Sequence, residues 1–181
     1  GVTVDRDRRL SCINDLVLNH EIDKKVKPDL TDPLLNELTD LIESPLLVTG
    51  CFDETFLELP PEVLSTVMKV HQRYIPLYKV NVEFDPLSLD SKNTLLPTFL
   101  CISNGLPSAK EKIIKGNEKV LKARFADASF FIKSDLLISS SSRIDKLKDV
   151  TFAEGLGSLY ERVNRMEWLV KLLTIKLEFD Q

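Results

Sequence analysis

The sequence has no long run of apolar residues, because charged and polar side chains interrupt every stretch well short of the roughly 18 residues that a membrane-spanning helix needs. It also lacks a secretory signal, since the segment from Gly1 to Arg9 is rich in charge and no apolar region follows it. These two absences argue against a membrane protein and a secreted one. We therefore expect a cytoplasmic protein that has no membrane partner.

Cysteine and histidine are scarce. Cys12, Cys51 and Cys101 lie far apart in apolar stretches, so we expect buried free thiols, neither a disulfide framework nor a metal pair. His20 and His71 are the only histidines, and a two-histidine metal site would have to join distant segments. We predict no metal site.

The common catalytic and nucleotide-binding motifs are missing as well. The sequence contains no GxGxxG, no phosphate-binding loop with Gly-Lys-Ser/Thr, no GxSxG and no HExxH. Neighbouring acids such as Asp53 and Glu54 are typical of solvent-facing loops. We therefore predict no catalytic residues and no cofactor in this chain.

One long segment has no positive charge. From Asp29 to Glu62, here called the acidic lobe, there are nine acids and no Lys or Arg, whereas Lys110 to Arg124 holds six basic residues and two acids. The net charge of −4 argues against a surface that coats nucleic acid as a whole. The uneven distribution is typical either of a protein that docks in a fixed orientation or of helices with solvated charged faces.

Hydrophobic periodicity predicts an α+β fold in which several helices flank a small, mostly antiparallel sheet and a long C-terminal helix follows. The expected helices are 5–25, 32–45, 60–71, 111–135 and 154–178, and the expected strands are 46–52, 75–84 and 95–103, with 56–59 as a possible addition. The serine run 139–142 is predicted as a loop. We assign 1–153 to an α+β accessory domain and 154–181 to a helix that leads toward a further domain of a longer chain.

A first cluster, His71-Gln72-Arg73-Tyr74, stands where a helix ends and a strand begins. Its donors, acceptor, cation and aromatic face suit contact with RNA or with a partner loop. Helical spacing places His71 on the inner or border face of its helix. Alternatively, His71 and Tyr74 pack at the helix end while Arg73 neutralises the terminal carbonyls.

A second cluster runs through Lys115, Gly116, Asn117, Glu118 and Lys119 to Arg124 and Asp127. Asn117 is predicted to cap a helix, and Gly116 before it gives the backbone the conformational freedom to enter that helix. A helix start with basic neighbours can hold a phosphate. The alternative is a capped helix in which Arg124 and Asp127 form an ion pair. Periodicity does not decide between them.

RNA contact is expected only at locally basic residues, because the chain as a whole repels a polyanion. These residues are Lys112, Lys115, Lys119, Lys122 and Arg124, with Arg73 as an outlying member. Lys115, Lys119 and Lys122 follow at four- and three-residue steps and therefore share a stripe of the predicted helix. The alternative is that the stripe is only the solvated side of an amphipathic helix.

Five stretches form a recognisable series. They are Leu59-Pro60-Pro61-Glu62-Val63-Leu64; Met68 with His71-Gln72-Arg73-Tyr74; Phe99 with Ile102-Ser103-Asn104; Gly116-Asn117-Glu118-Lys119-Val120-Leu121 with Ala123-Arg124 and Asp127-Ala128-Ser129-Phe130-Phe131; and Val150-Thr151-Phe152 with Leu156-Gly157-Ser158-Leu159. In this order they closely resemble the bacterial glycyl-tRNA synthetase beta subunit family, as a fragment from its N-terminal half. The segment from Val80 to Asn93 is longer and more polar than the family pattern.

The resemblance implies a heterotetrameric class II synthetase of two alpha and two beta subunits that acts on tRNA(Gly). ATP, with magnesium, and the chemistry are expected on the alpha subunit, while the beta subunit contributes tRNA binding. The fragment itself is therefore predicted to be inactive. The two clusters, the basic residues and Asn104 are the candidates for contact with tRNA or with another domain.

Three hypotheses compete. The first is a synthetase subunit module that touches tRNA or neighbouring domains, and the second is a free-standing protein-binding module whose acidic lobe docks a basic partner. The third is a small hydrolase that uses His71 and a carboxylate. The order of the motifs favours the first, and the missing nucleophile motif disfavours the third.

Overall fold

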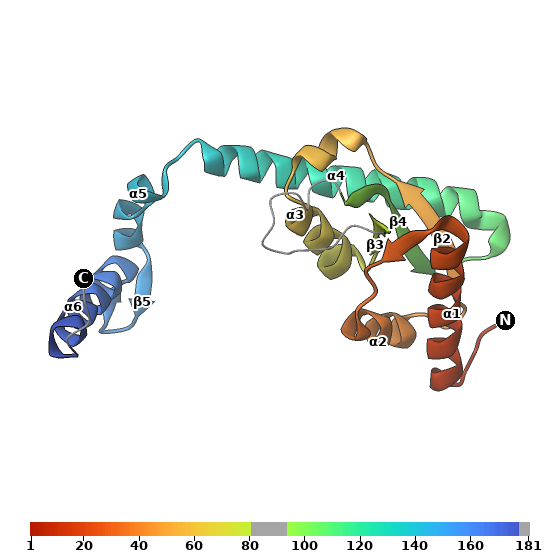
Figure 1. The fold of residues 1–181 in the computed structure, drawn as a ribbon, viewed down its shortest axis with the longest axis horizontal. Coiled ribbons are helices and arrows are strands. Elements are labelled where there is room, and N and C mark those ends of the chain that lie inside the picture. Colours follow the sequence, from red (N-terminus) through yellow and green to blue (C-terminus); the bar gives the residue numbers. More distant parts are fainter. Residues whose placement is uncertain (81–93, 178–181) are drawn as a thin grey trace. The chain divides into compact units, whose positions relative to one another are not determined.

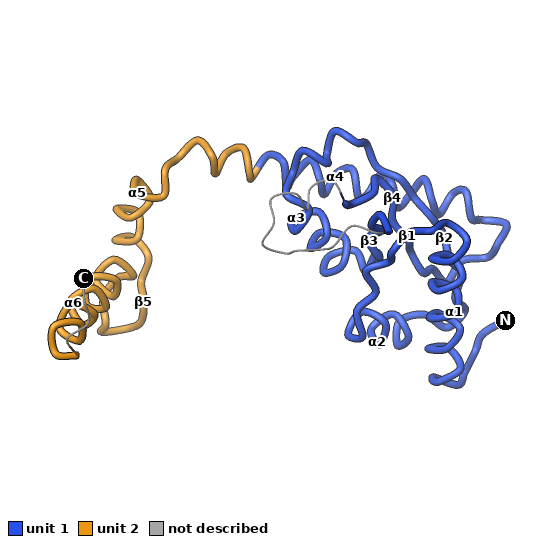
Figure 2. The backbone as a smooth tube through the Cα atoms, in the orientation of Figure 1, with its two compact units in different colours: residues 1–130 blue, residues 131–181 orange. Residues whose placement is uncertain are grey.

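The computed structural model describes residues 1–80 and 94–177 and confirms the α+β fold (Figure 1). The chain divides into two compact units, residues 1–130 and 131–181 (Figure 2). The domain boundary predicted between residues 153 and 154 falls inside the second unit. Because it concerns the domains of a longer chain, it stays a prediction. Positions 81–93, which include most of the long polar segment and the end of the strand expected at 75–84, lie outside the described residues.

The first unit is built on a four-stranded antiparallel sheet with the strand order β1-β3-β4-β2. The strands are β1 (Val26–Pro28), β2 (Leu46–Cys51), β3 (Ile75–Lys79) and β4 (Leu95–Ser103). The structure confirms the prediction of strands at 46–52 and 95–103 and the antiparallel pairing of the last two predicted strands. Sequence analysis missed β1, whose three residues carry too short a pattern to detect.

Two helices cover one face of this sheet. In α1 (Arg6–Lys24) and α2 (Asp32–Leu41), apolar residues at helical spacing point inward. They meet the alternate strand residues of β3 and β4 in one buried cluster of Ile13, Val17, Leu34, Leu38, Ile75, Leu77, Leu100 and Ile102. Asp5 caps α1 by accepting a hydrogen bond from the Arg8 amide at 2.8 Å, so the helix begins one residue after the predicted start.

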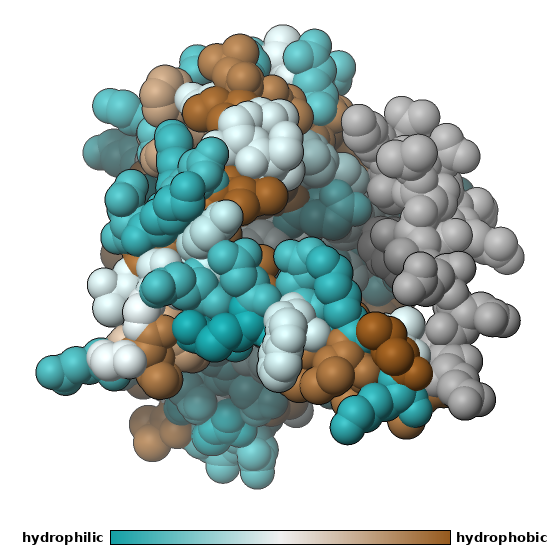
Figure 3. All heavy atoms as spheres, turned by 90° about the vertical axis from the view of Figure 1, so that its left-hand side faces the viewer, coloured by the Kyte–Doolittle hydropathy of each residue, from teal (hydrophilic) through white to brown (hydrophobic). Residues whose placement is uncertain are grey.

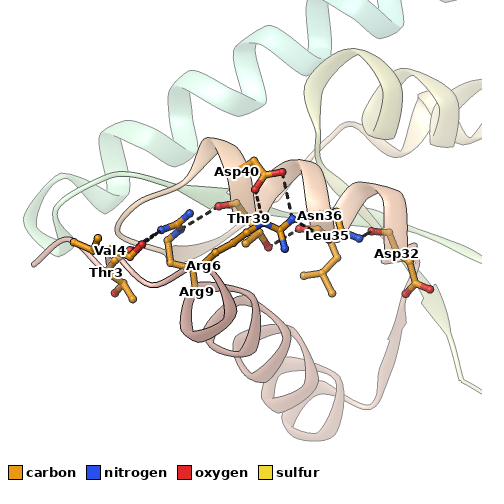
Figure 4. A network of polar contacts seen from close by, with 9 residues as sticks. All are labelled: Thr3, Val4, Arg6, Arg9, Asp32, Leu35, Asn36, Thr39 and Asp40. Carbon is orange, nitrogen blue, oxygen red and sulfur yellow. Dashed lines mark hydrogen bonds and ion pairs between the residues drawn. The ribbon is translucent and has the colours of Figure 1, made fainter.

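Two arginines of α1 bind the backbone and side chains of α2 (Figure 4). Arg9 donates to the carbonyl oxygens of Thr3, Val4 and Thr39 at 2.8, 2.7 and 3.1 Å. Arg6 forms an ion pair with Asp40 at 2.7 Å. This network joins the N-terminal segment, α1 and α2. The two helices therefore form one connected layer on this side of the sheet.

The other face of the sheet is covered by α3 (Pro61–Thr66), by the π-helical turn Val67–Gln72 and by α4 (Lys110–Leu136). Phe99 lies at its centre, because residues of β4 alternate between the two faces. Its ring stacks on Tyr74 with 4.7 Å between centroids, and Gly50 lies opposite it in β2. The fully buried Phe125 of α4 packs edge-on against Phe52, with 5.0 Å between ring centroids.

The second unit contains α5 (Ser140–Arg143), a hairpin of β5 (Thr151–Ala153) and β6 (Gly157–Ser158), and α6 (Leu159–Lys176). The helix expected from residue 154 begins five residues later, because Ser158 and Glu161 form a capping box that fixes its start. The serine run is not the predicted loop, since Ser139 caps α5 and the next three serines belong to that helix. On the side that Figure 3 faces, apolar and polar side chains are interspersed.

Two further expectations were wrong. Residues 56–59 do not form a strand, because Asp53 accepts a hydrogen bond from the Thr55 amide and starts a 3₁₀ helix at Glu54–Glu58. The helix expected over 32–45 is shorter than predicted, because α2 stops at Leu41, four residues before Pro45. No helix in residues 1–80 and 94–177 is both long enough and apolar enough to cross a bilayer.

Candidate nucleic-acid interface

The basic residues of the second cluster lie on α4, a helix with one buried side and one open side. Leu121 and Phe125 are fully buried and hold the helix against the sheet. On the open side, four exposed lysines form what we call the lysine stripe: Lys112, Lys115, Lys119 and Lys122. At 3.6 residues per turn these four side chains leave the helix within an arc of about 80°. A row of that kind can follow a phosphate backbone.

Arg124 lies away from the lysine stripe. It is exposed, but it comes five residues after Lys119, which places it about 140° further round the helix axis. Asp127 is exposed as well, and no ion pair joins these two described side chains. The bridge between Arg124 and Asp127 that the sequence allowed is therefore not present.

Asn117 does not cap a helix. Because α4 begins at Lys110, Gly116 and Asn117 lie in its interior, where backbone amides bond to carbonyls of the preceding turn. The interpretation of Gly116 and Asn117 as a helix start that holds a phosphate is therefore wrong. Asn117 is half-buried, and its side chain lowers the pKa of the Cys101 thiol against the larger, opposite effect of burial.

Glu118 holds the same side of α4 to the end of β2. Its Oε1 atom accepts hydrogen bonds from the backbone amide and the thiol of Cys51, at 2.9 and 3.1 Å. The second cluster therefore has two sides, one that anchors the helix and one that carries the lysines. Sequence analysis missed the anchoring role, since the contact joins residues 67 positions apart and leaves no local signal.

The first cluster is divided among three environments. Tyr74 is buried on Phe99, and burial raises the pKa of its hydroxyl to about 12. Arg73 has a left-handed backbone conformation with φ of 54° and forms an ion pair with Glu37 at 2.8 Å. Gln72 is half-buried, and His71 is exposed. The prediction that His71 lies on an inner or border face is wrong.

The cause is a change of helix type. Residues Val67–Gln72 form a π-helical turn, whose wider spacing displaces the side chains that follow the buried Met68. The Tyr74 amide then donates to the Met68 carbonyl at 2.9 Å and closes the helix. Arg73 also donates weakly to the His71 carbonyl at 3.4 Å, which agrees with the role that the alternative interpretation gives to Arg73, whereas the exposed His71 departs from that interpretation.

The side chain of Asn104 forms hydrogen bonds with backbone groups of a neighbouring connection. Its side-chain oxygen accepts hydrogen bonds from the amides of Glu43 and Ser44 at 2.8 and 2.9 Å, and its nitrogen donates to the Leu41 carbonyl at 3.3 Å. These bonds hold the connection from α2 to β2 beside the end of β4. The side chain thus satisfies backbone groups where a helix ends.

The acidic lobe is partly neutralised by basic residues from other segments. Asp29 pairs with Lys69 at 2.5 Å, Glu37 with Arg73 at 2.8 Å and Asp40 with Arg6 at 2.7 Å. The guanidinium of Arg6 lowers the pKa of Asp40 through this hydrogen bond. The lobe is therefore less acidic as a surface than its sequence indicates.

The three cysteines are free, as predicted, but only one is buried. Cys101 is buried, which raises the pKa of its thiol to about 11. Cys12 is half-buried and Cys51 is exposed, so the expected burial of Cys51 is wrong. Within the described ranges, no three His, Cys, Asp or Glu side chains gather in a way that could hold a metal ion.

Comparison with known proteins gives one consistent family. The family model for the glycyl-tRNA synthetase beta subunit matches residues 1–181. The glycine–tRNA ligase beta subunit of Trichodesmium erythraeum is 42% identical over 180 residues, which cover 99% of this chain and 24% of that protein. The corresponding subunit of Bacillus subtilis is 39% identical over 150 residues, covering 83% of this chain and 20% of the relative.

A beta subunit from Coxiella burnetii is 38% identical over 180 residues and again covers 99% of the chain. The chain spans about a quarter of the length of such relatives, with 24% for the subunits from Trichodesmium and Coxiella. Because the family model matches every residue of the sequence, the chain belongs to the glycyl-tRNA synthetase beta subunit family.

Proposed function

We propose that this chain is a non-catalytic segment of a glycine–tRNA ligase beta subunit, and that it supports aminoacylation by binding tRNA(Gly) along the lysine stripe. One observation carries the proposal: four exposed lysines line one side of a helix whose other side is fixed to the core. The chain has a net charge of −4, so a polyanion is attracted only where positive charge is locally concentrated.

We also propose roles for the remaining parts of the enzyme. The name beta subunit implies an alpha subunit, and we propose that the alpha subunit carries ATP, magnesium and the site of glycine activation. A second beta subunit would complete an alpha2-beta2 assembly in the cytoplasm. His71, Gln72 and Asp127 are proposed to contact tRNA or another domain, since each retains some solvent exposure.

The alternative of a free-standing module with an acidic docking lobe is less well supported. Three carboxylates of the lobe, those of Asp29, Glu37 and Asp40, are already paired with basic side chains of the same chain. A basic partner would have to displace these pairs or use the remaining acids.

A charge-reversal experiment tests the tRNA proposal. In the full-length beta subunit, Lys115, Lys119 and Lys122 are replaced together by Glu, and tRNA affinity is measured at several salt concentrations. Loss of three phosphate contacts is expected to weaken binding and to make the slope of log K against log salt shallower by roughly 2 to 3.

A matched control separates local contact from total charge. Lys24, Lys27 and Lys79 are exposed lysines of α1, β1 and β3, and their replacement by Glu changes the net charge by the same amount. We expect this control to retain most of the affinity. Equal losses in the two folded variants, or no loss in the α4 variant, would contradict the proposal.

The non-catalytic part of the proposal has its own assay. The purified chain is expected to show no glycine-dependent exchange of pyrophosphate into ATP, whereas the complete enzyme does. Exchange by the chain alone, after contaminating synthetase has been excluded, would place chemistry in this segment.

A further inference from the structure

The last helix of the second unit is α6, drawn in blue in Figure 1, and it carries apolar residues on two opposite sides. Residues at alternating steps of four and three form what we call the first seam: Leu159, Val163, Met166, Val170, Leu173 and, just beyond the helix end, Leu177. At 3.6 residues per turn these side chains leave the axis within an arc of about 80°. Three others form the second seam, about 180° away: Trp168, Leu172 and Ile175.

Most of both seams is open to solvent. Among the residues of α6, all of which the structure describes, none is buried. Val170 in the first seam is 60% exposed, and Trp168 and Ile175 in the second seam are 65% and 71% exposed. A single helix of this length is only marginally stable in water, and apolar residues on both sides are typical of a helix in a protein interior. The seams therefore indicate a surface that another element covers.

The contacts that α6 makes within its unit lie between the seams. Arg162 lies over the ring of Phe152, 4.4 Å from its centroid, and Arg165 donates to the Leu156 carbonyl at 2.8 Å. Both contacts join the helix to the segment that contains β5 and β6, and both come from one polar side of α6. The β5–β6 hairpin thus holds α6 by a polar side, and the apolar residues of the two seams stay available for other partners.

The spacing of the seams indicates what kind of partner fits. Alternating steps of four and three are typical of a helix that packs against another helix. A two-stranded coiled coil with a second copy of the chain is disfavoured, because the first seam spans about two and a half heptads and sustained coiled coils are recognised by roughly three to four. Such a pair would also leave the second seam in water. Two opposite seams instead fit a helix that lies between two neighbours.

The family relatives supply enough chain for such neighbours. The match with the Trichodesmium subunit covers 24% of that protein, so about three quarters of its length lies outside the matched part. Neighbouring helices from the same subunit are held close to α6 by the chain itself, whereas a separate partner must give up its freedom of movement to bind. The same subunit is therefore the favoured source of both neighbours.

We propose that α6 is an inner helix of a helical bundle, which helices of the same beta subunit from outside residues 1–181 complete by packing on both seams. This inference goes beyond the proposed function. It depends on the membership of the chain in the beta subunit family and does not need the lysine stripe to bind tRNA. It gives the second unit the role of a junction between the sheet-containing unit and the rest of the subunit.

Cysteine accessibility in the full-length beta subunit tests whether the seams are covered. Val170→Cys probes the first seam and Ile175→Cys the second. Glu167→Cys is the matched control, because Glu167 lies between the seams and its side chain is 61% exposed. Each variant is treated with a charged, water-soluble maleimide, in the native state and in urea, and mass spectrometry of the peptide that carries the new cysteine gives the two rates.

The two seam cysteines are expected to be protected by the fold. Relative to the control, their ratio of native rate to rate in urea should be lower by at least about tenfold, since a thiol must be accessible to react. The protection should not change with protein concentration, because the covering helices belong to the same chain.

A photo-cross-link identifies the covering element. p-Benzoylphenylalanine in place of Trp168 conserves a large aromatic side chain in the second seam, and irradiation joins it to the residues that it touches. The product is expected to migrate as a single beta subunit on a denaturing gel, and the joined peptide is expected to lie outside residues 1–181.

Several results would overturn the inference. One is a seam cysteine that reacts as fast as the control, which would show that its seam is open. Others are a cross-link to a second copy or to residues 1–130, the absence of any cross-link, and protection that appears only when the alpha subunit is added. Neither experiment measures tRNA affinity, so failure here leaves the proposed function standing, and failure of the lysine replacements leaves this inference standing.

Discussion

Glu118 and Cys51 are joined twice: one carboxylate oxygen accepts the backbone amide at 2.9 Å and the thiol at 3.1 Å. This pair ties the middle of α4 to the last residue of β2. It also fixes the rotation of α4 about its own axis, because Glu118 lies between the buried Leu121 and the exposed lysines. The direction in which the lysine stripe faces is thus set by this contact and by the buried side chains of the same helix.

The same contact controls the reactivity of Cys51. The hydrogen bond to Glu118 raises the pKa of the thiol, with burial and the negative charge adding to the effect. In Glu118→Gln the charge is gone, so the pKa of Cys51 is expected to fall and its thiolate fraction at pH 8 to increase. Alkylation of Cys51 measured by mass spectrometry should become faster, with the buried Cys101 as the unreactive internal standard. An unchanged rate for Cys51 would mean that the carboxylate does not influence the thiol.

Gly50 is a packing requirement of the sheet. A Cβ atom at this position would come within 2.5 Å of Cζ of Phe99, a fully buried ring that stacks on Tyr74. Gly50→Ala is therefore expected to lower the free energy of unfolding by about 1–3 kcal/mol, the usual cost of overpacking. Urea denaturation measures this loss.

A second substitution identifies the cause. Phe99→Leu is destabilising by itself because it removes ring volume, but it makes room for the new methyl group. The double variant Gly50→Ala, Phe99→Leu should therefore be more stable than the sum of the two single losses predicts. Strict additivity would show that the methyl group and the ring do not collide.

His20 is expected to titrate below its usual pKa of about 6.5. Burial lowers the pKa most, and the positive charges of Lys24 and Lys110 lower it further, while Asp23 acts in the opposite direction. The unfolded chain then binds a proton more readily than the folded one, so stability is complete above about pH 6.5 and falls as the pH drops toward the depressed pKa. NMR titration should show a lower pKa for His20 than for a model peptide. Lys110→Met should raise it, and an unchanged value would exclude Lys110 as a neighbour.

Local patterns were sufficient for most of the fold. The strand predicted from Leu95 to Ser103 matches β4 at both ends, and α1 begins one residue after the predicted start at Asp5. The wrong predictions came from positions where tertiary contacts outweigh local preference. Gly116 and Asn117 look like a helix start, but burial of Leu121 and Phe125 on the sheet carries one helix through them.

The candidate site was predictable only in part. The three-residue and four-residue steps of the lysines are a property of the helix itself, so their common side follows from the sequence. The position of His71 depends on a π-helical turn, and no residue pattern indicates that turn in advance. The partners of Arg73 and Asn104 come from α2 and the connection after it, more than 30 residues away in the chain.

Lysine footprinting of the full-length beta subunit reports directly on whether the lysine stripe binds tRNA. The free subunit and its complex with tRNA(Gly) are treated briefly with an acylating reagent, and modification of each lysine is measured by mass spectrometry. We expect tRNA to protect Lys115, Lys119 and Lys122, whereas Lys24 and Lys79, which are also exposed, react at the same rate in both samples. If the lysines of α4 are modified as fast in the saturated complex as in the free subunit, the stripe does not bind tRNA.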